Sequence, residues 1–328
     1  MARAAKRLPA GVRFALTGTP IENRLSELWS IFDFLMPGLL GTRESFAKRF
    51  ESPVEHAEGD SAARLQALVS PFVLRRVKED VVADLPEKIE DTVMAQLTGE
   101  QRKLYLANQD RIAQQVQHRE AGEFKKDKLK VLAELTKLRQ ICCDPRLHYE
   151  DYKAGSAKLD TCMELVHGAL DGGHRILLFS QFTGMLDIIG KRLAKEGIAF
   201  LKLTGASSKE SRAKMVAQFQ AGEVPVFLIS LKAGGVGLNL TAADVVIHYD
   251  PWWNVAAQDQ ATDRAHRIGQ QHTVTVYKLI AKDTIEERIM QMQESKRDLV
   301  NSVLGGDGIS SALFTREDVL ALLGGDGR

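Results

Sequence analysis

The sequence predicts an α/β fold in which a parallel sheet has helices on both faces, and two observations support this prediction. From residue 156 onward, apolar segments alternate with segments of helical periodicity, which is typical of parallel strands joined by crossover helices. The apolar segments hold few polar residues, as strands do when both faces of their sheet are covered. The expected strands are 175–182, 200–204, 224–230, 244–249 and 273–280, and the expected helices are 158–171, 184–196, 208–220 and 254–267.

Two further regions are predicted before this sheet. Residues 71–145 are expected to be mostly helical, with one helix that starts at the capping pair Thr98 and Gln101 and another over 125–141. Residues 13–18 are expected to end a strand, and the helix that follows is expected to start at Thr19-Pro20 and to stop at Pro37-Gly38. One strand and one helix are only part of a sheet domain, so the first domain is expected to be incomplete.

The composition excludes several classes of protein. The 328 residues include 44 Lys and Arg against 43 Asp and Glu, for a net charge of +1, and 44% are hydrophobic, which excludes wholesale disorder, collagen and a disulfide scaffold. No apolar run approaches the roughly 20 residues of a membrane span. The three cysteines fit a reducing compartment. Because the net charge is near zero, any contact with nucleic acid must come from individually placed residues.

The segment 254–272 is the most informative one. On a helix, Gln260, Arg264 and Arg267 would share one face, and two arginines a turn apart can form a fork for a phosphate chain. The alternative is a solvated face on which Asp259 and Asp263 pair with these arginines.

The segment 230–239 is rich in glycine and follows an apolar strand. Its backbone N–H groups can approach an anion, although a tight turn between strand and helix explains the glycines equally well. The adjacent Trp252 and Trp253 cannot both face a core from one regular element, so one is expected to pack and the other to be exposed. Gly184, Gly190 and Lys191 resemble a phosphate-binding loop, but their spacing and the following Arg192 argue against that role.

Taken together, these segments resemble the C-terminal half of the Swi/Snf-type ATPases, the branch of helicase superfamily two that translocates on duplex DNA. The matching stretches are LTGTPIEN at 16–23, FVLRR at 72–76, LRQIC at 138–142, ILLFSQF at 176–182, LTG at 203–205, SLKAGGVGLNL at 230–240, DPWWN at 250–254 and QATDRAHRIGQ at 260–270. The resemblance implies two RecA-like lobes with helical protrusions, with ATP in the cleft between the lobes and DNA across both.

Applied to this chain, the resemblance implies four regions. Residues 1–70 would be the C-terminal remnant of lobe one, 71–155 the helical protrusions and linker, 156–300 lobe two, and 301–328 a C-terminal tail.

The resemblance also implies roles for individual residues. Arg264 and Arg267 would reach the γ-phosphate of ATP with help from Gln260, and Gly235, Gly237 and Asn239 would lie near the nucleotide. The residues implied to contact DNA are Gln181, Gly205, Ser230, Lys232 and Trp253, and those implied to couple the lobes are Thr17, Gly18 and Thr19.

Parts of the family pattern are missing from this sequence. It holds no G-x-x-x-x-G-K-[S/T] loop and no Asp-Glu pair after an apolar strand, which are the parts that cradle phosphates and hold Mg²⁺. The chain is therefore expected to be a fragment that does not hydrolyse ATP alone, with the Mg²⁺ ligands on the missing part of lobe one.

The expected function is that of the C-terminal part of an ATP-dependent translocase on double-stranded DNA. Its expected partners are duplex DNA of any sequence, the missing N-terminal lobe and a DNA-bound protein complex, with no membrane. Two alternatives are a stand-alone nucleic-acid-binding or interaction module without ATP turnover, and a strand-separating helicase. The expected location is cytoplasmic and nucleoid-associated in a bacterium, or nuclear in a eukaryote.

Overall fold

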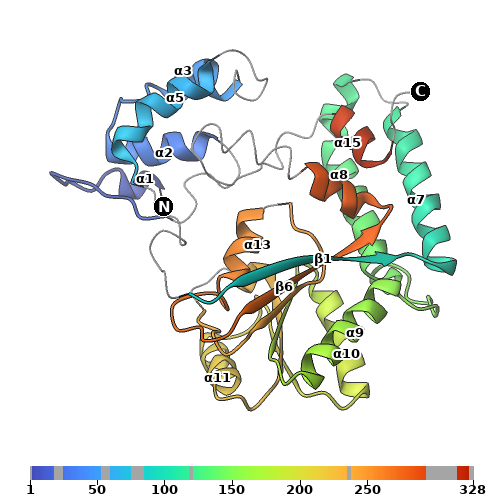
Figure 1. Cartoon of the computed structure of the whole chain (residues 1–328). Helices are drawn as coiled ribbons and strands as arrows, with labels where there is room; N and C mark the ends of the chain where they lie inside the picture. Colours follow the sequence, from blue (N-terminus) through green and yellow to red (C-terminus); the bar gives the residue numbers. More distant parts are fainter. Residues whose placement is uncertain are drawn as a thin grey trace. The chain divides into compact units, whose positions relative to one another are not determined.

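The computed structural model describes residues 2–17, 25–52, 60–74, 85–117, 121–234, 238–253, 255–292 and 316–324 (Figure 1). The chain divides into two compact units, one mainly of residues 1–81 and the other mainly of 82–252 and 257–291. Among the described helices, none is long and apolar enough to cross a membrane.

The regular elements in the described part of the first unit are all helical. Its elements are α1 (Ala2–Ala5), α2 (Leu25–Leu35), α3 (Arg43–Phe46), the π-helical turn η1 (Ala47–Glu51), α5 (Ser61–Val69) and the 3-10 turn η2 (Ser70–Phe72). Leu28 and Phe32, one turn apart on α2, pack with Phe46, Phe50 and Leu65 into one core.

The expected strand end at 13–18 was wrong for its described residues, 13–17, which form no strand. A strand needs a hydrogen-bonded neighbour, and the described part of this unit holds no strand to supply one. Phe14 is accordingly 83% exposed and Leu16 is fully exposed. The expected helix start at Thr19-Pro20 lies outside the described residues.

The second unit is built on a six-stranded parallel sheet with the strand order β1-β6-β5-β2-β4-β3. Its strands are β1 (Lys88–Gln96), β2 (Ile176–Ser180), β3 (Phe200–Leu203), β4 (Val226–Ser230), β5 (Val245–His248) and β6 (Val274–Lys282). Its other elements are α7 (Gly99–Gln117), α8 (Ala121–Cys143), the 3-10 turn η3 (Pro145–Leu147), α9 (Ala157–Asp171), α10 (Thr183–Lys195), α11 (Lys209–Gln220), α12 (Leu231–Gly234), α13 (Val255–Thr262), a helix over residues 285–292, and α15 (Arg316–Leu322). The predicted α/β class and five of the six strands are confirmed.

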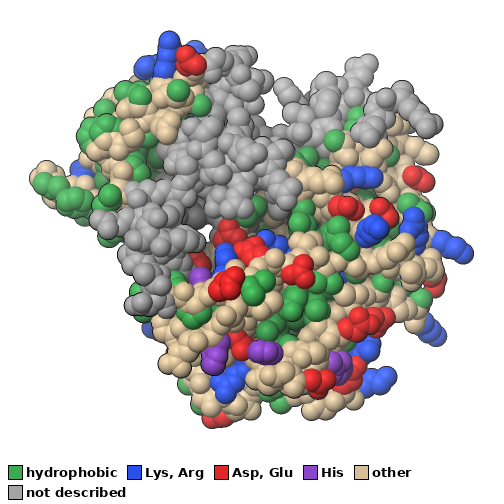
Figure 2. Space-filling view, viewed as in Figure 1, with side chains coloured by type: hydrophobic (Ala, Val, Ile, Leu, Met, Phe, Trp, Pro, Cys, Tyr) green, Lys and Arg blue, Asp and Glu red, His purple; other side chains and the backbone are tan. Residues whose placement is uncertain are grey.

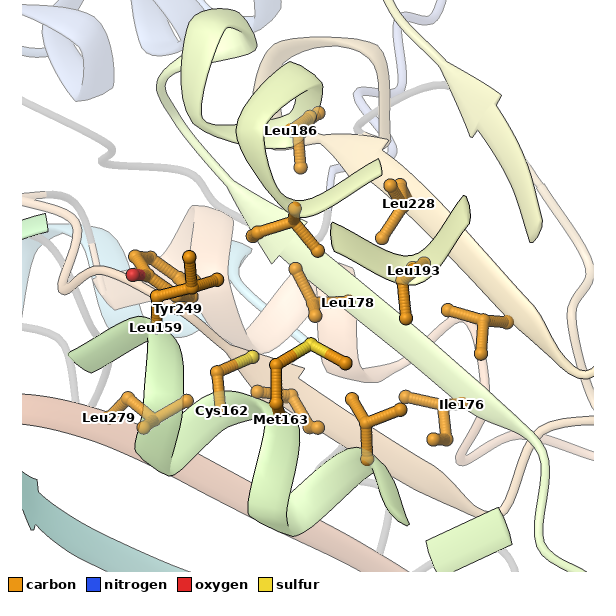
Figure 3. Packing of buried hydrophobic residues seen from close by; sticks show 14 of the residues in the cluster. Leu159, Cys162, Met163, Ile176, Leu178, Leu186, Leu193, Leu228, Tyr249 and Leu279 are labelled. Carbon is orange, nitrogen blue, oxygen red and sulfur yellow. The ribbon is translucent and has the colours of Figure 1, made fainter. Parts of the chain in front are cut away.

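A separate core covers each face of this sheet, because successive side chains of a strand point to opposite faces. Leu178 and Leu228 pack with Met163 from α9 and Leu186 from α10, as Figure 3 shows. On the opposite face, the cluster joins alternate residues of the same strands to Phe219 from α11 and Ala261 from α13. The central strands β2, β4 and β5 are buried along their whole length, which explains their continuous apolar sequences.

Residues 71–145 are mostly helical, as expected, but they also contain the strand β1, which was not predicted. It pairs in parallel with β6 over its full length and forms one edge of the sheet. Most of its residues are exposed, so its sequence lacks the apolar character of the central strands. The helices expected at 98–117 and 125–141 are present as α7 and α8.

A buried ion pair lies beneath the sheet. Lys158 Nζ lies 2.5 Å from Glu286 Oε2, and both side chains are fully buried. Glu286 also accepts a hydrogen bond from the N–H of Ala281 at 2.9 Å. Burial opposes the charged form of Lys158, but the carboxylate of Glu286 outweighs it and raises the pKa of Lys158 above its usual value. The pair thus ties α9 to the helix at 285–292.

Candidate functional site

The sheet brings four of the residues predicted to contact DNA to one edge. Because all strands are parallel, their carboxyl ends lie at the same edge, and Ser180 of β2 is directly paired with Ser230 of β4. Gln181 follows β2, Gly205 follows β3 by two residues, Ser230 ends β4, and Lys232 lies in α12. The side chain of Lys232 lies outside what the structure describes. We call this region the carboxyl edge.

A buried carboxylate organises the carboxyl edge. Asp250, just after β5, is fully buried, and it accepts hydrogen bonds from the Ser180 hydroxyl and from the N–H of Gln181, the latter at 3.3 Å. A buried carboxylate needs such donors, because burial without them is costly. Asp250 was not predicted as a functional residue, although an aspartate near the end of an apolar strand was an available signal.

The predicted DNA contacts differ in their exposure. Gly205 is exposed, and a Cβ built on it would meet nothing within 4 Å, so its backbone is open to a ligand. The side chain of Ser230 is only 3% exposed. Trp252 packs against the core on the α11 and α13 face, whereas Trp253 is half-buried, so neither indole is as exposed as the sequence suggested.

The helix expected over 254–267 was wrong in its second half, because α13 ends at Thr262. Beyond Thr262 the N–H groups of Arg264 and Ala265 donate to the carbonyls three residues earlier, at 3.2 and 3.0 Å, which are turn bonds and not α-helical ones. The carbonyl of Arg264 accepts from the N–H of Leu240 at 2.9 Å, outside the helix. Residues 263–269 instead form turns that end at Gly269, whose φ of +100° favours glycine. Arg264 and Arg267 therefore lie on a turn segment and do not share a regular helical face with Gln260.

This turn segment, residues 263–270, brings the two predicted arginines close together. Burial lowers the pKa of Arg264 below its usual value, the nearby guanidinium of Arg267 lowers it further, and Asp263 opposes the shift. Arg267 Nη1 also donates a hydrogen bond to the carbonyl of Leu238 at 3.3 Å. The guanidiniums of Arg264 and Arg267 thus lie beside the loop that contains Asn239. The side chain of Asn239 is exposed.

The remaining predicted nucleotide residues are only partly placed. Gln260 lies on α13 and is exposed, whereas Gly235 and Gly237 lie outside the described residues. Of the residues predicted to couple the lobes, Thr17 is exposed in the first unit, and Gly18 and Thr19 also lie outside the described residues.

Gln270 holds the turn segment in place. Its side chain is 6% exposed, and its Nε2 donates to the carbonyls of Ala243 at 2.8 Å and of Thr241 and Ala265 at 3.1 Å. Its Oε1 accepts from the N–H groups of the next two residues at 2.8 and 2.9 Å. The sequence did not predict this role, because nothing in it distinguishes Gln270 from the exposed Gln271.

A second link joins the end of α13 to β5. His248 Nε2 and Thr262 Oγ1 lie 2.8 Å apart, and the His248 ring stacks on Phe179 with centroids 5.5 Å apart. Burial, with a smaller contribution from Lys278, lowers the pKa of His248 to about 3, so the ring is neutral at ordinary pH. Through this contact the neutral His248 holds Thr262, which lies two positions before Arg264.

Other sequence signals have structural explanations. Gly190 lies in α10, where a Cβ would meet the Phe200 ring at 2.9 Å, so this glycine permits close packing of helix on sheet. Cys142, Cys143 and Cys162 are buried free thiols, and burial raises the pKa of Cys162 to about 12. Within the described ranges, no group of three or more His, Cys, Asp or Glu side chains is placed to hold a metal ion.

The described part of the face shown in Figure 2 carries no large patch of one charge sign. Acidic and basic side chains are interspersed over the described part of the face shown in Figure 2. This agrees with a net charge of +1 and means that any anion site depends on local groups such as the two arginines.

Comparison with known proteins gives matches along most of the chain. Residues 1–147 match the SNF2-related domain and residues 157–269 match the helicase conserved C-terminal domain. A putative ATP-dependent helicase/translocase, YwqA, from Bacillus subtilis is 41% identical over 96% of this chain and 35% of its own length. The chain spans about a third of the length of the curated relatives it matches.

Two solved structures from Sulfolobus solfataricus are also similar. The SWI2/SNF2 ATPase core in complex with double-stranded DNA is 38% identical with a TM-score of 0.58, over 93% of this chain and 65% of that one. The C-terminal domain of a SWI2/SNF2 ATPase is 34% identical with a TM-score of 0.56, over 68% of this chain and 91% of that one.

Proposed function

Because the chain belongs to the SWI2/SNF2 family of ATPases, we propose that it forms the second-lobe part of an ATP-dependent translocase on double-stranded DNA. The relatives it resembles include ATP-dependent helicases and an ATPase core in complex with duplex DNA, which supports ATP and duplex DNA as the ligands. Residues 1–70 would be the end of lobe one, 156–300 lobe two, and 301–328 the tail. Residues 71–155 would supply the protrusions and linker together with β1, which pairs with β6 in the sheet of lobe two.

The observation that carries this proposal is the pair of guanidiniums on the turn segment. Arg264 and Arg267 lie close enough for one to lower the pKa of the other, an arrangement that a bound polyphosphate would stabilise. In phosphoryl transfer, negative charge spreads over the oxygens of the γ-phosphate, and fixed guanidiniums stabilise that charge. Arg264 and Arg267 would therefore act as arginine fingers, with Gln260 and Asn239 beside them and Gly235 and Gly237 near the nucleotide.

The carboxyl edge would hold the DNA backbone. Gln181, Gly205, Ser230 and Lys232 would contact phosphates and sugars there, and Trp253 is proposed as a separate DNA contact. Phosphates and sugars carry no sequence information, so binding would be independent of sequence. Affinity would fall by about 0.9 log units per log unit of salt for each phosphate neutralised.

The two candidate sites would be mechanically linked through the end of β5. His248 holds Thr262, next to the arginines, while Asp250 holds Ser180 and Gln181 at the carboxyl edge. These two residues are separated by Tyr249 alone, so a shift of the turn segment on ATP hydrolysis would reach the DNA contacts over a short, buried path.

Among the described residues no group of three or more His, Cys, Asp or Glu side chains is placed to hold a metal ion, and no residue of this chain is assigned to Mg²⁺. The chain also contains no G-x-x-x-x-G-K-[S/T] loop. We therefore expect the 328-residue chain to bind duplex DNA weakly and to release no phosphate from ATP above background.

Phosphate release by a protein that joins this chain to a lobe with a phosphate loop tests the proposal. The expected result is ATP turnover that duplex DNA stimulates, with no strand displacement. DNA binding without turnover in that protein would favour the stand-alone binding module, and displacement of a strand would favour a helicase.

A further inference from the structure

Arg139 is a buried charge that the proposed function does not use. It lies in α8, within the stretch 138–142, and its side chain is 1% exposed. A guanidinium in the interior is costly unless polar groups hold it, so its partners indicate what it stabilises.

The partners of Arg139 come from the carboxyl edge. Its Nη1 donates to Gln181 Oε1 at 3.2 Å, and its Nη2 donates to the carbonyl of Pro251. Its Cζ lies 5.7 Å from the centroid of the Phe182 ring. One guanidinium from α8 therefore contacts the segment after β2 and the segment after β5 at the same time.

These contacts also fix the orientation of the Gln181 amide. Arginine can only donate hydrogen bonds, so the amide must turn its oxygen toward Arg139 and its nitrogen away. That nitrogen, Nε2, is buried and has no hydrogen-bond partner among the described residues. A buried donor without an acceptor is unfavourable, and a phosphate oxygen that displaced the atoms covering Nε2 would supply that acceptor.

We propose that Arg139 is a positioning residue for the DNA contacts at the carboxyl edge. It selects the amide orientation in which Gln181 presents a donor to a phosphate, and it holds the Pro251 turn that leads to Trp252 and Trp253. It thereby links helix α8 to the surface that grips the duplex. This inference rests on the proposed function and extends it to a residue that need not touch DNA.

The test measures binding of a fluorescent duplex of arbitrary sequence to the 328-residue chain at several salt concentrations, well below each variant's melting temperature. Arg139→Met should weaken binding about 2- to 10-fold, the range expected for one lost hydrogen bond. Its salt slope should be unchanged, because Arg139 neutralises no phosphate. Lys232→Ala should instead reduce that slope by about 0.9.

A second variant separates positioning from folding. Gln181→Glu keeps an acceptor for Arg139 but removes the Nε2 donor, so it should retain the melting temperature and still weaken binding. In a double-mutant cycle, Gln181→Ala should add little to the loss caused by Arg139→Met. If Arg139→Met does not fold, Arg139→Lys replaces it in the cycle. A lysine lacks the planar guanidinium that donates to Gln181 and to the Pro251 carbonyl at the same time.

The matched control is Lys158→Met, which removes another buried cation whose hydrogen-bonded partner is Glu286 rather than a residue of the carboxyl edge. It should lower stability and leave DNA affinity unchanged. Equal losses of affinity in Lys158→Met and Arg139→Met, additive effects in the cycle, or a reduced salt slope in Arg139→Met would overturn the proposal. Failure of the parent chain to bind duplex DNA would overturn the proposed function itself.

Discussion

Replacing Gln270 with alanine should loosen the turn segment that carries the two arginines. Gln270 joins residues 241–243, Ala265 and residues 271–272 through one side chain. The amide has two N–H hydrogens and one acceptor oxygen, so we count about four effective hydrogen bonds. At about 0.5–1.5 kcal/mol each, with some carbonyls regaining water, Gln270→Ala should cost about 2–4 kcal/mol.

Urea unfolding and native-state hydrogen exchange measure this effect. The N–H of Leu240 reports on the turn segment directly, because it donates to the carbonyl of Arg264. Its exchange should be faster in Gln270→Ala. Gln271→Ala is the matched control, since Gln271 is adjacent and exposed, and it should change stability by less than about 0.5 kcal/mol. If Gln270→Ala behaves like Gln271→Ala in both measurements, the assigned role of Gln270 is wrong.

Two further predictions concern ion pairs of the second unit. Lys158→Met leaves Glu286 buried without its cation, so urea unfolding should show a loss of about 3–5 kcal/mol; a loss below about 1 kcal/mol would contradict the burial of this pair. Burial alone would raise the pKa of Glu90, but hydrogen bonds from Lys278 and Lys88 lower it to about 2, below the usual value of 4.5. Glu90 therefore stabilises the fold above pH 4.5, and this contribution is lost as the pH falls from 4.5 to 2. Glu90→Gln should flatten the pH dependence of the unfolding free energy in that window, and an unchanged pH profile would refute the assignment.

The central sheet could be predicted from the sequence because its signal is local. Strands such as β2 and β4 are continuous apolar segments, and they are buried on both faces. The edge strand β1 carries no such signal. Its sequence includes Lys88, Glu90 and Asp91, most of its residues are exposed, and only its pairing with the distant β6 makes it a strand.

The candidate site was predictable in part. The sequence placed the arginines and the Gly-rich loop near each other by family resemblance, but it extended α13 too far. After Thr262 the backbone forms turns, and the carbonyl of Arg264 accepts a hydrogen bond from the N–H of Leu240. Such a contact between distant segments leaves no periodic pattern in the sequence. The roles of Arg139 and Gln270 were also not predictable, because a sequence does not reveal which of its polar residues are buried.

Turnover by arginine variants tests the central claim most directly. In a protein that joins this chain to a lobe with a phosphate loop, Arg267→Ala and Arg264→Ala should each lower kcat by roughly 10³–10⁵, as loss of an arginine finger does. ATP affinity, duplex binding and the melting temperature should change little, because the interaction forms mainly in the transition state. If these arginines serve only as surface partners of Asp259 or Asp263, stability should change by about 1 kcal/mol at most. A kcat within a few-fold of the parent would then contradict the arginine-finger assignment for that residue.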